Sequence, residues 1–226
     1  MNPPPLHIGL IIFPGFQGLD AFGPLDILNT LSWTHPLTIS VLADTLTPTS
    51  TKSPLHPTAT GQLIQPTHTF SSPPTDLDVL LVPGGLGTRD LAATAPAVSF
   101  IRDVFPRLQY LITVCTGATL AARAGVLDGR RATTNKMAFR EISAAYPAVQ
   151  WVARARWVVD GNVWSSSGVS AGMDVVFGWV DRVYGLAVAE RIAKGLEYEW
   201  VYRDGREDPF AVVYGVGEEE EEEEKS

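Results

Sequence analysis

Three strongly apolar runs, each followed by small residues and then by a helical pattern, constrain the fold of this 226-residue chain more than any other feature. They are Leu6–Phe13, Asp78–Pro83 and Tyr110–Val114. A strand that is apolar at nearly every position is covered on both faces, as in a parallel sheet between two layers of helices. The repeated order of strand, turn and helix supplies the crossover connections that such a sheet needs. The sequence therefore predicts an α/β fold with a mostly parallel central sheet.

Weaker signals predict the other elements. Gly23-Pro24 is expected to open the first helix, because proline suits the first helical position. The segment 44–74 is rich in Thr, Ser and Pro and has room only for short strands. Asp160-Gly161, between β-forming residues, predicts a hairpin over 157–164. Further helices are expected over 96–105, 116–124, 137–146, 170–184 and 186–198.

The formal charge of −8 is concentrated at the C-terminus, in the glutamate run Glu218–Glu224. Residues 1–217 carry 16 basic and 18 acidic side chains, a net charge of −2. This nearly neutral body offers no basic surface to nucleic acid. We expect one domain over 1–205 and an extension over 206–226 that ends in a disordered tail.

A single cysteine, Cys115, excludes an internal disulfide and any multi-cysteine metal site. No stretch reaches the roughly 18 consecutive apolar residues that span a bilayer. The first residues also lack the basic flank and apolar core of a secretory signal. We therefore expect a cytoplasmic protein that binds neither membrane nor nucleic acid.

Cys115 lies where the run Tyr110–Val114 gives way to Thr116-Gly117-Ala118. A sharp turn from strand to helix exposes its residue at the carboxyl edge of the sheet, below unpaired amides of the helix. A thiol in this place is expected to have a lowered pKa and to act as a nucleophile. The small residues after it, Gly117 among them, would leave room for substrate above the sulfur. The alternative is that Cys115 is a small core residue, the more frequent role of a free cysteine.

The turns after the other two apolar runs should reach the same edge of the sheet. Asp20 follows the first run in an apolar setting, where burial would favour its protonated form and let it exchange a proton with Cys115. The alternative is a helix-capping aspartate. Gly84 and Gly85 follow the second run, and their amides could form an anion hole with the amide of Thr116, or could simply make a tight turn. The Thr116 hydroxyl could point at substrate or bond the first turn of its own helix.

Four segments resemble, in this order, motifs of the ThiJ/PfpI superfamily, and within it the isonitrile hydratase branch and its fungal relatives. They are F-P-G-F-Q-G-L-D-A-F-G-P-L-D from Phe13, V-P-G-G-L-G from Val82, V-C-T-G-A from Val114 with the later A-G-V-L-D-G-R-R-A-T-T, and S-S-S-G-V-S-A-G-M-D from Ser165. The resemblance covers about residues 6–200. Four ordered motifs are much more specific than any one alone.

This resemblance implies a flavodoxin-like three-layer sandwich, usually a homodimer, with Cys115 at a nucleophile elbow. It also implies that Asp20 is the acidic partner and that Thr116 and Gly85 line the pocket. Many relatives have a histidine where this chain has Asn135, and asparagine cannot act as a general base. The four histidines of the chain all precede the Cys115 strand, which further disfavours a Cys-His pair.

The hypothesis that follows is hydration of a small electrophile, an isonitrile. Cys115 attacks the terminal carbon, Asp20 moves the proton, and water then releases an N-substituted formamide from a thioimidate. Neither step needs a metal or an organic cofactor. One alternative is a glyoxalase or deglycase acting on 2-oxoaldehydes. A second is a non-enzymatic redox or ligand sensor that uses Cys115.

Overall fold

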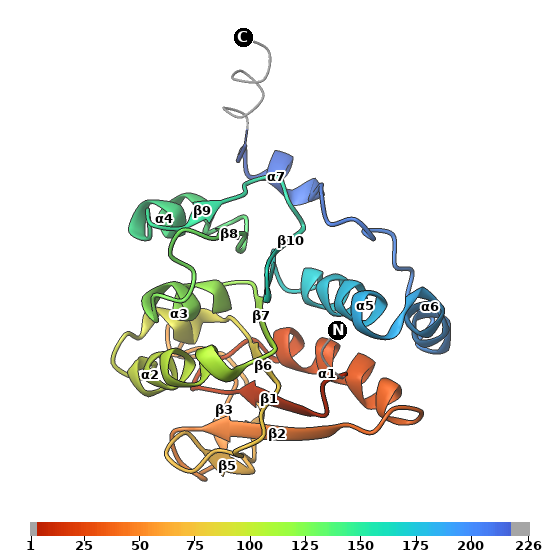
Figure 1. Ribbon diagram of the computed structural model, residues 1–226. Helices are drawn as coiled ribbons and strands as arrows, with labels where there is room; N and C mark the ends of the chain where they lie inside the picture. Colours follow the sequence, from red (N-terminus) through yellow and green to blue (C-terminus); the bar gives the residue numbers. More distant parts are fainter. Residues whose placement is uncertain (1–3, 218–226) are drawn as a thin grey trace.

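The computed structural model describes residues 4–217 and has a seven-stranded central sheet with the order β10-β11-β7-β6-β1-β2-β5 (Figure 1). All neighbours pair in parallel except β10 and β11, which form the predicted hairpin. The mostly parallel α/β sheet expected from the sequence is thereby confirmed. The strands are β1 (His7–Ile11), β2 (Thr38–Ala43), β5 (His68–Thr69), β6 (Val79–Val82), β7 (Tyr110–Val114), β10 (Trp157–Asp160) and β11 (Val163–Ser166).

Helices cover both faces of this sheet and make three layers (Figure 1). On one face lie α1 (Gly18–Ser32), α5 (Ala171–Tyr184) and α6 (Leu186–Gly195), and on the other lie α2 (Ala95–Val104) and α3 (Gly117–Arg123). Every residue of β1 and β6 is buried, as the continuous apolar runs require. The short 3₁₀ helices η1 (Leu86–Arg89) and η2 (Phe105–Arg107) follow β6 and α2.

A small lobe with its own apolar cluster lies beyond the carboxyl end of β7 (Figure 1). It contains the parallel pair β8 (Arg131–Ala132) and β9 (Gln150–Trp151), together with α4 (Phe139–Ala145) and α7 (Pro209–Val213). Phe139, Ala153, Ala211 and Val216 form its buried cluster. The C-terminal segment thus packs against α4. The remaining pair, β3 (Thr49–Ser50) and β4 (Leu63–Ile64), lies in the segment where only short strands were expected.

The first helix begins six residues before the predicted first helical position, Pro24. It starts at Gly18 and contains Pro24 in its interior, so the prediction that Gly23-Pro24 opens it is wrong. A tertiary contact sets the start, since the Gln17 N–H donates to the Gly84 carbonyl at 2.7 Å. Pro24 has no N–H for the Asp20 carbonyl four residues earlier, and the helix tolerates that missing bond. As a result, Asp20 lies within the first turn of α1 rather than ahead of the helix.

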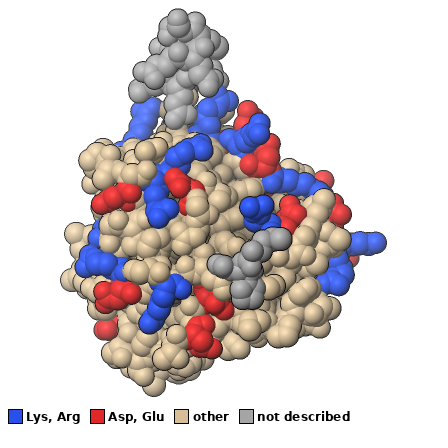
Figure 2. Space-filling model, in the orientation of Figure 1, with Lys and Arg blue, Asp and Glu red and all other residues tan. Residues whose placement is uncertain are grey.

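Charged side chains of both signs are interspersed on the face shown in Figure 2. Within residues 4–217, no helix is both long and apolar enough to cross a membrane. The glutamate run 218–224 lies outside the described residues. The domain boundary at residue 205 stays a prediction.

Candidate active site

Cys115 occupies the turn between β7 and α3, as the sequence predicts, and has a φ of 57°. A positive φ is uncommon for a residue with a Cβ and persists only where the surroundings impose it. The Cys115 N–H donates to the carbonyls of Ser166 and Ser167 at 3.2 and 3.0 Å, and its carbonyl accepts from Thr134 Oγ1 at 2.9 Å. These bonds come from the ends of neighbouring segments and hold the elbow in its strained form.

Asp20 is fully buried and reaches this elbow from α1. Its Oδ2 accepts the Gly84 N–H at 2.9 Å, and no side chain caps α1, so the helix-capping alternative is not what the structure has. Burial raises the pKa of Asp20 to about 7, although Gly84 and the Cys115 thiol act in the opposite direction. The other oxygen, Oδ1, is buried without a partner in hydrogen-bonding geometry within residues 4–217. Asp20 therefore titrates near neutral pH.

The Cys115 thiol is also buried, and this reverses the expected direction of its pKa. Burial, and then the negative charge of Asp20, raise the pKa of Cys115 to about 12. The amides of Val169 and Thr116 and the side chain of Asn135 donate to the sulfur and lower the pKa by less than burial raises it. The sequence prediction of a lowered pKa is thus wrong, because the helix amides are outweighed by desolvation. In the resting site the thiol keeps its proton, and Asp20 is the adjacent group able to take it.

The two glycines after β6 place main chain against main chain. The Gly84 N–H is donated to Asp20 and the Gly85 N–H to Thr116 Oγ1 at 2.9 Å, which corrects the expectation that both amides form an anion hole. The Thr116 hydroxyl donates to the Gly85 carbonyl at 3.2 Å rather than to its own helix. A Cβ on Gly84 would lie 2.5 Å from the Thr116 nitrogen, and one on Gly117 would clash with the carbonyl oxygen of Val82. The substrate-binding role predicted for these glycines stays a prediction.

Two neighbours of the sulfur were not among the predicted site residues. Asn135 accepts the Ala138 N–H at 3.2 Å through Oδ1 and donates to Cys115 through its amide. Val169 follows β11 and has a φ of 27°. Because β11 is parallel to β7, its carboxyl end reaches the same edge of the sheet as Cys115. The S-S-S-G-V-S segment could have been identified on this basis, had the hairpin been placed beside β7.

A pocket of about 330 Å³ opens beside the elbow, and Thr116 and Thr119 form part of its wall. Its apolar lining comes mostly from α4 and its flanks, with Leu91, Ala138, Ile142, Ala145 and Tyr146. Arg89 and Glu141, 3.7 Å apart, also line it. Ala138 in the pocket wall donates its N–H to Asn135, and the Asn135 side chain in turn acts on the Cys115 sulfur.

The described histidines leave Cys115 without an imidazole partner. His7 lies at the amino end of β1, where its ring contacts Asp76 and Ser40 at 2.9 and 2.8 Å. His68 is in the edge strand β5. The site is therefore a thiol and a carboxylic acid, surrounded by backbone amides and one asparagine.

Comparisons with known proteins agree with this fold. Residues 7–181 match the model of the DJ-1/PfpI family. The chain belongs to the DJ-1/PfpI family. An isonitrile hydratase of Pseudomonas putida is 33% identical over 193 residues, which cover 85% of this chain and 78% of that protein. A deglycase of Pyrococcus horikoshii is 35% identical over 100 residues, 44% of this chain and 58% of that protein.

Among solved structures of the DJ-1/PfpI fold, a ThiJ/PfpI family protein from Pseudomonas syringae superimposes with a TM-score of 0.74 at 30% identity. The similarity covers 88% of this chain and 76% of that one. The family match over residues 7–181 thus covers all seven strands of the central sheet, the helices α1, α2 and α3, and the Cys115 elbow.

Proposed function

We propose that this protein is a cofactor-independent hydro-lyase of the isonitrile hydratase branch, which converts an isonitrile to an N-substituted formamide through Cys115. The observation that carries the proposal is the buried pair of Cys115 and Asp20, the latter with a pKa of about 7, in a site without histidine. A peptide or amide substrate would call for a cysteine activated by a base such as histidine. The isonitrile hydratase that is 33% identical adds support.

In the first step, Asp20 as carboxylate accepts the thiol proton while the sulfur bonds to the terminal carbon of R–N≡C. Asp20 then returns the proton to that carbon. The product is the thioimidate R–N=CH–S–Cys115, and the net change is addition of S–H at one carbon. The acid must change protonation state within one turnover, and a pKa of about 7 suits that requirement.

In the second step, water adds to the thioimidate carbon and Asp20 transfers the proton to nitrogen. The intermediate R–NH–CH(OH)–S–Cys115 then loses its carbon–sulfur bond. The hydroxyl proton passes by way of Asp20 to the sulfur, which regenerates the thiol and leaves R–NH–CHO. The amides of Val169 and Thr116 stabilise the sulfur as it leaves.

The apolar pocket beside Thr116 supports an organic substituent on the substrate. Its volume of about 330 Å³ is at the small end of ligand sites, and Ile142 and Ala145 would contact a cyclohexyl or aryl group. We infer that the substrate is a small electrophile with an apolar substituent. We also propose a homodimer, which light scattering of the purified chain would test.

Two other functions remain as alternatives. A deglycase or glyoxalase reaction is favoured by the Pyrococcus horikoshii deglycase that is similar over 100 residues. A sensor function is favoured by the lone buried thiol next to an acid, in which Cys115 would be oxidised without turnover.

The deciding experiment measures formamide production from cyclohexyl isonitrile by wild type, Cys115→Ala, Asp20→Asn and Asp26→Asn. Asp26 is exposed on the same helix as Asp20 and serves as the matched control. We expect the first two substitutions to abolish turnover and Asp26→Asn to leave it unchanged. Turnover that survives in Cys115→Ala would refute the proposal. Lactate from methylglyoxal, without formamide from the isonitrile, would establish the glyoxalase alternative.

A further inference from the structure

Val169, whose N–H acts on the Cys115 sulfur, lies in a loop that other residues must hold in place. The Val169 N–H acts on the Cys115 thiol and lowers its pKa, and Val169 has a φ of 27°, which a β-branched residue adopts only under constraint. Its own loop supplies few bonds, namely Ala171 N–H to the Gly168 carbonyl at 2.9 Å and Gly172 N–H to the Val169 carbonyl at 3.1 Å. The constraint must therefore also come from outside the loop.

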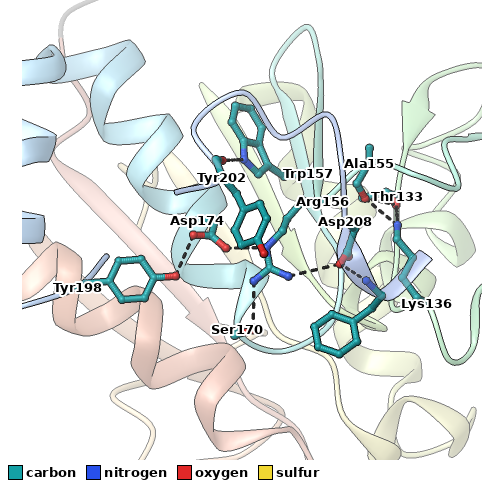
Figure 3. A network of polar contacts seen from close by, with 11 residues as sticks. Thr133, Lys136, Ala155, Arg156, Trp157, Ser170, Asp174, Tyr198, Tyr202 and Asp208 are labelled. Atoms are coloured by element: carbon teal, nitrogen blue, oxygen red, sulfur yellow. Dashed lines mark hydrogen bonds and ion pairs between the residues drawn. The ribbon is translucent and has the colours of Figure 1, made fainter. Parts of the chain in front are cut away.

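Arg156, the residue just before β10, supplies this constraint (Figure 3). The side chain is 5% exposed, and its guanidinium binds three groups on two segments. Nε donates to Asp174 Oδ2 at 2.7 Å, Nη2 to Ser170 Oγ at 3.2 Å and Nη1 to Asp208 Oδ1 at 3.5 Å. Ser170 directly follows Val169, and Asp174 lies in the first turn of α5, so two of these bonds act on the segment that carries the Val169 amide.

The main chain of Arg156 acts on the same loop. Its carbonyl accepts the Ser167 N–H at 2.8 Å, and the Ser167 carbonyl accepts the Cys115 N–H at 3.0 Å. Arg156 thus fixes the segment 167–170 at both of its ends. Cys115 is hydrogen-bonded to Ser167 at the first end and lies beside Val169 at the second.

The C-terminal segment keeps the guanidinium in place (Figure 3). The Tyr202 ring lies 4.4 Å from the Arg156 Cζ, and the Gly205 carbonyl accepts the Arg156 N–H at 2.8 Å. Asp208 caps α7 by accepting the Phe210 N–H at 3.0 Å. Burial raises the pKa of Asp174, whose Oδ1 also accepts the Tyr198 hydroxyl at 2.8 Å. A buried cation between two buried carboxylates leaves both unpaired if it is removed.

We propose that Arg156 is a positioning residue for Cys115: it holds the Ser167–Ser170 loop so that the Val169 N–H faces the sulfur. Lysine cannot replace it, because an ammonium is a single point on a flexible stem, whereas the planar fork has donors in three fixed directions. The proposal rests on the nucleophilic Cys115 of the proposed function but not on the isonitrile.

The test is the rate of alkylation of the only cysteine by iodoacetamide between pH 6 and pH 10, in full-length variants shown to be folded by circular dichroism. Loss of a donor to the sulfur raises the thiol pKa, and each unit lowers the thiolate fraction tenfold. We expect Arg156→Lys to react about tenfold more slowly at pH 8 and Ser170→Ala, which removes only the hydroxyl that Arg156 holds, about threefold. Arg203→Gln breaks an exposed pair with Glu190 in the same C-terminal segment and should match wild type.

Folded variants with the wild-type alkylation profile would show that Arg156 only stabilises the fold. Faster alkylation in the folded variants would show that the loop merely shields the thiol. Each of these results overturns the proposal. If Arg156→Lys does not fold, Ser170→Ala decides alone. If the variants are alkylated more slowly than the wild type but the wild type hydrates no isonitrile, the positioning role is retained and only the proposed function is rejected.

Discussion

The Gly84 N–H donates a 2.9 Å hydrogen bond to Asp20 Oδ2 and so joins two residues that are 64 positions apart in the sequence. An oxygen that accepts a backbone N–H is a poor place for a proton, so a protonated Asp20 carries its proton on Oδ1. This bond thereby decides which oxygen exchanges protons in the site. It also ties the glycine turn after β6 to the first turn of α1.

Asp20→Asn is expected to make the protein more stable at alkaline pH while removing activity. In the folded state the carboxyl has a pKa of about 7, against 3.8 for an unperturbed aspartate, so the folded state binds the proton more tightly. Stability from this group is therefore complete at low pH and is lost as the pH rises from about 4 through about 7. Between pH 5 and pH 8 the wild type should lose roughly 2 to 3 kcal/mol that Asp20→Asn keeps.

Urea unfolding at both pH values measures this difference, with Asp26→Asn as the exposed control on the same helix. If the free energy of unfolding falls by the same amount in wild type and in Asp20→Asn between pH 5 and pH 8, the pKa of Asp20 is not raised. A more stable and inactive variant would be an instance of a site that trades stability for function.

The pH dependence of catalysis follows from the same carboxyl. Because the carboxylate form must accept the thiol proton, kcat/KM should rise with pH through an apparent pKa near 7. The value belongs to the Asp20–Cys115 pair rather than to one residue. A rate that falls with increasing pH over this range would mean that the protonated acid is the required form in the free enzyme. Initial rates in buffers of constant ionic strength between pH 5 and pH 9 give the profile.

Gly84→Ala should damage both stability and activity. The added Cβ would lie 2.5 Å from the Thr116 nitrogen and 2.6 Å from Thr116 Oγ1, so the main chain must move. We expect a loss of about 1 to 3 kcal/mol and a large fall in kcat, because the moved amide no longer orients Asp20. Gly195→Ala is the control, since a Cβ there meets nothing within 4 Å. Wild-type melting and turnover in Gly84→Ala would show that the turn is not rigid.

Ala145→Trp should narrow the substrate range. Ala145 lines the pocket and is exposed, so the indole can enter the pocket without disturbing the core. We expect KM for cyclohexyl isonitrile to rise about tenfold and that for methyl isonitrile to change little. The neighbouring Ala144 is exposed on α4 and is not part of the pocket wall, so Ala144→Trp should behave as wild type. Equal effects on both substrates would place the organic substituent elsewhere.

The strands that flank the site were predictable because their apolar runs are continuous. β1, β6 and β7 each lie within a predicted run, and their order in one parallel sheet brings Asp20, Gly84 and Cys115 to one edge. The start of α1 was not predictable from propensity, because a hydrogen bond from Gln17 to the distant Gly84 carbonyl sets it.

The pKa values and hydrogen bonds of the site could not be predicted from the sequence as well as its strands could. The direction of the Cys115 pKa depends on how deeply the thiol is buried and on Asp20, and both are set by tertiary packing. The hydrogen bonds of the Gly84 and Gly85 amides to Asp20 and Thr116 also depend on tertiary distances at the carboxyl edge of the sheet. Asn135 and Val169 lie in or beside the family motifs A-T-T and S-S-S-G-V-S, but only the tertiary structure places them beside the thiol.

The contrast between the floor of the site and its wall has a consequence for how such a site can change. At Gly84, Gly85 and Gly117 the floor is main chain packed on main chain, so side-chain substitutions there have almost no room to alter it. The wall belongs largely to α4, in a lobe with its own apolar cluster. Selection or engineering can therefore exchange that lobe for another and retune substrate choice while the thiol and its acid stay where they are.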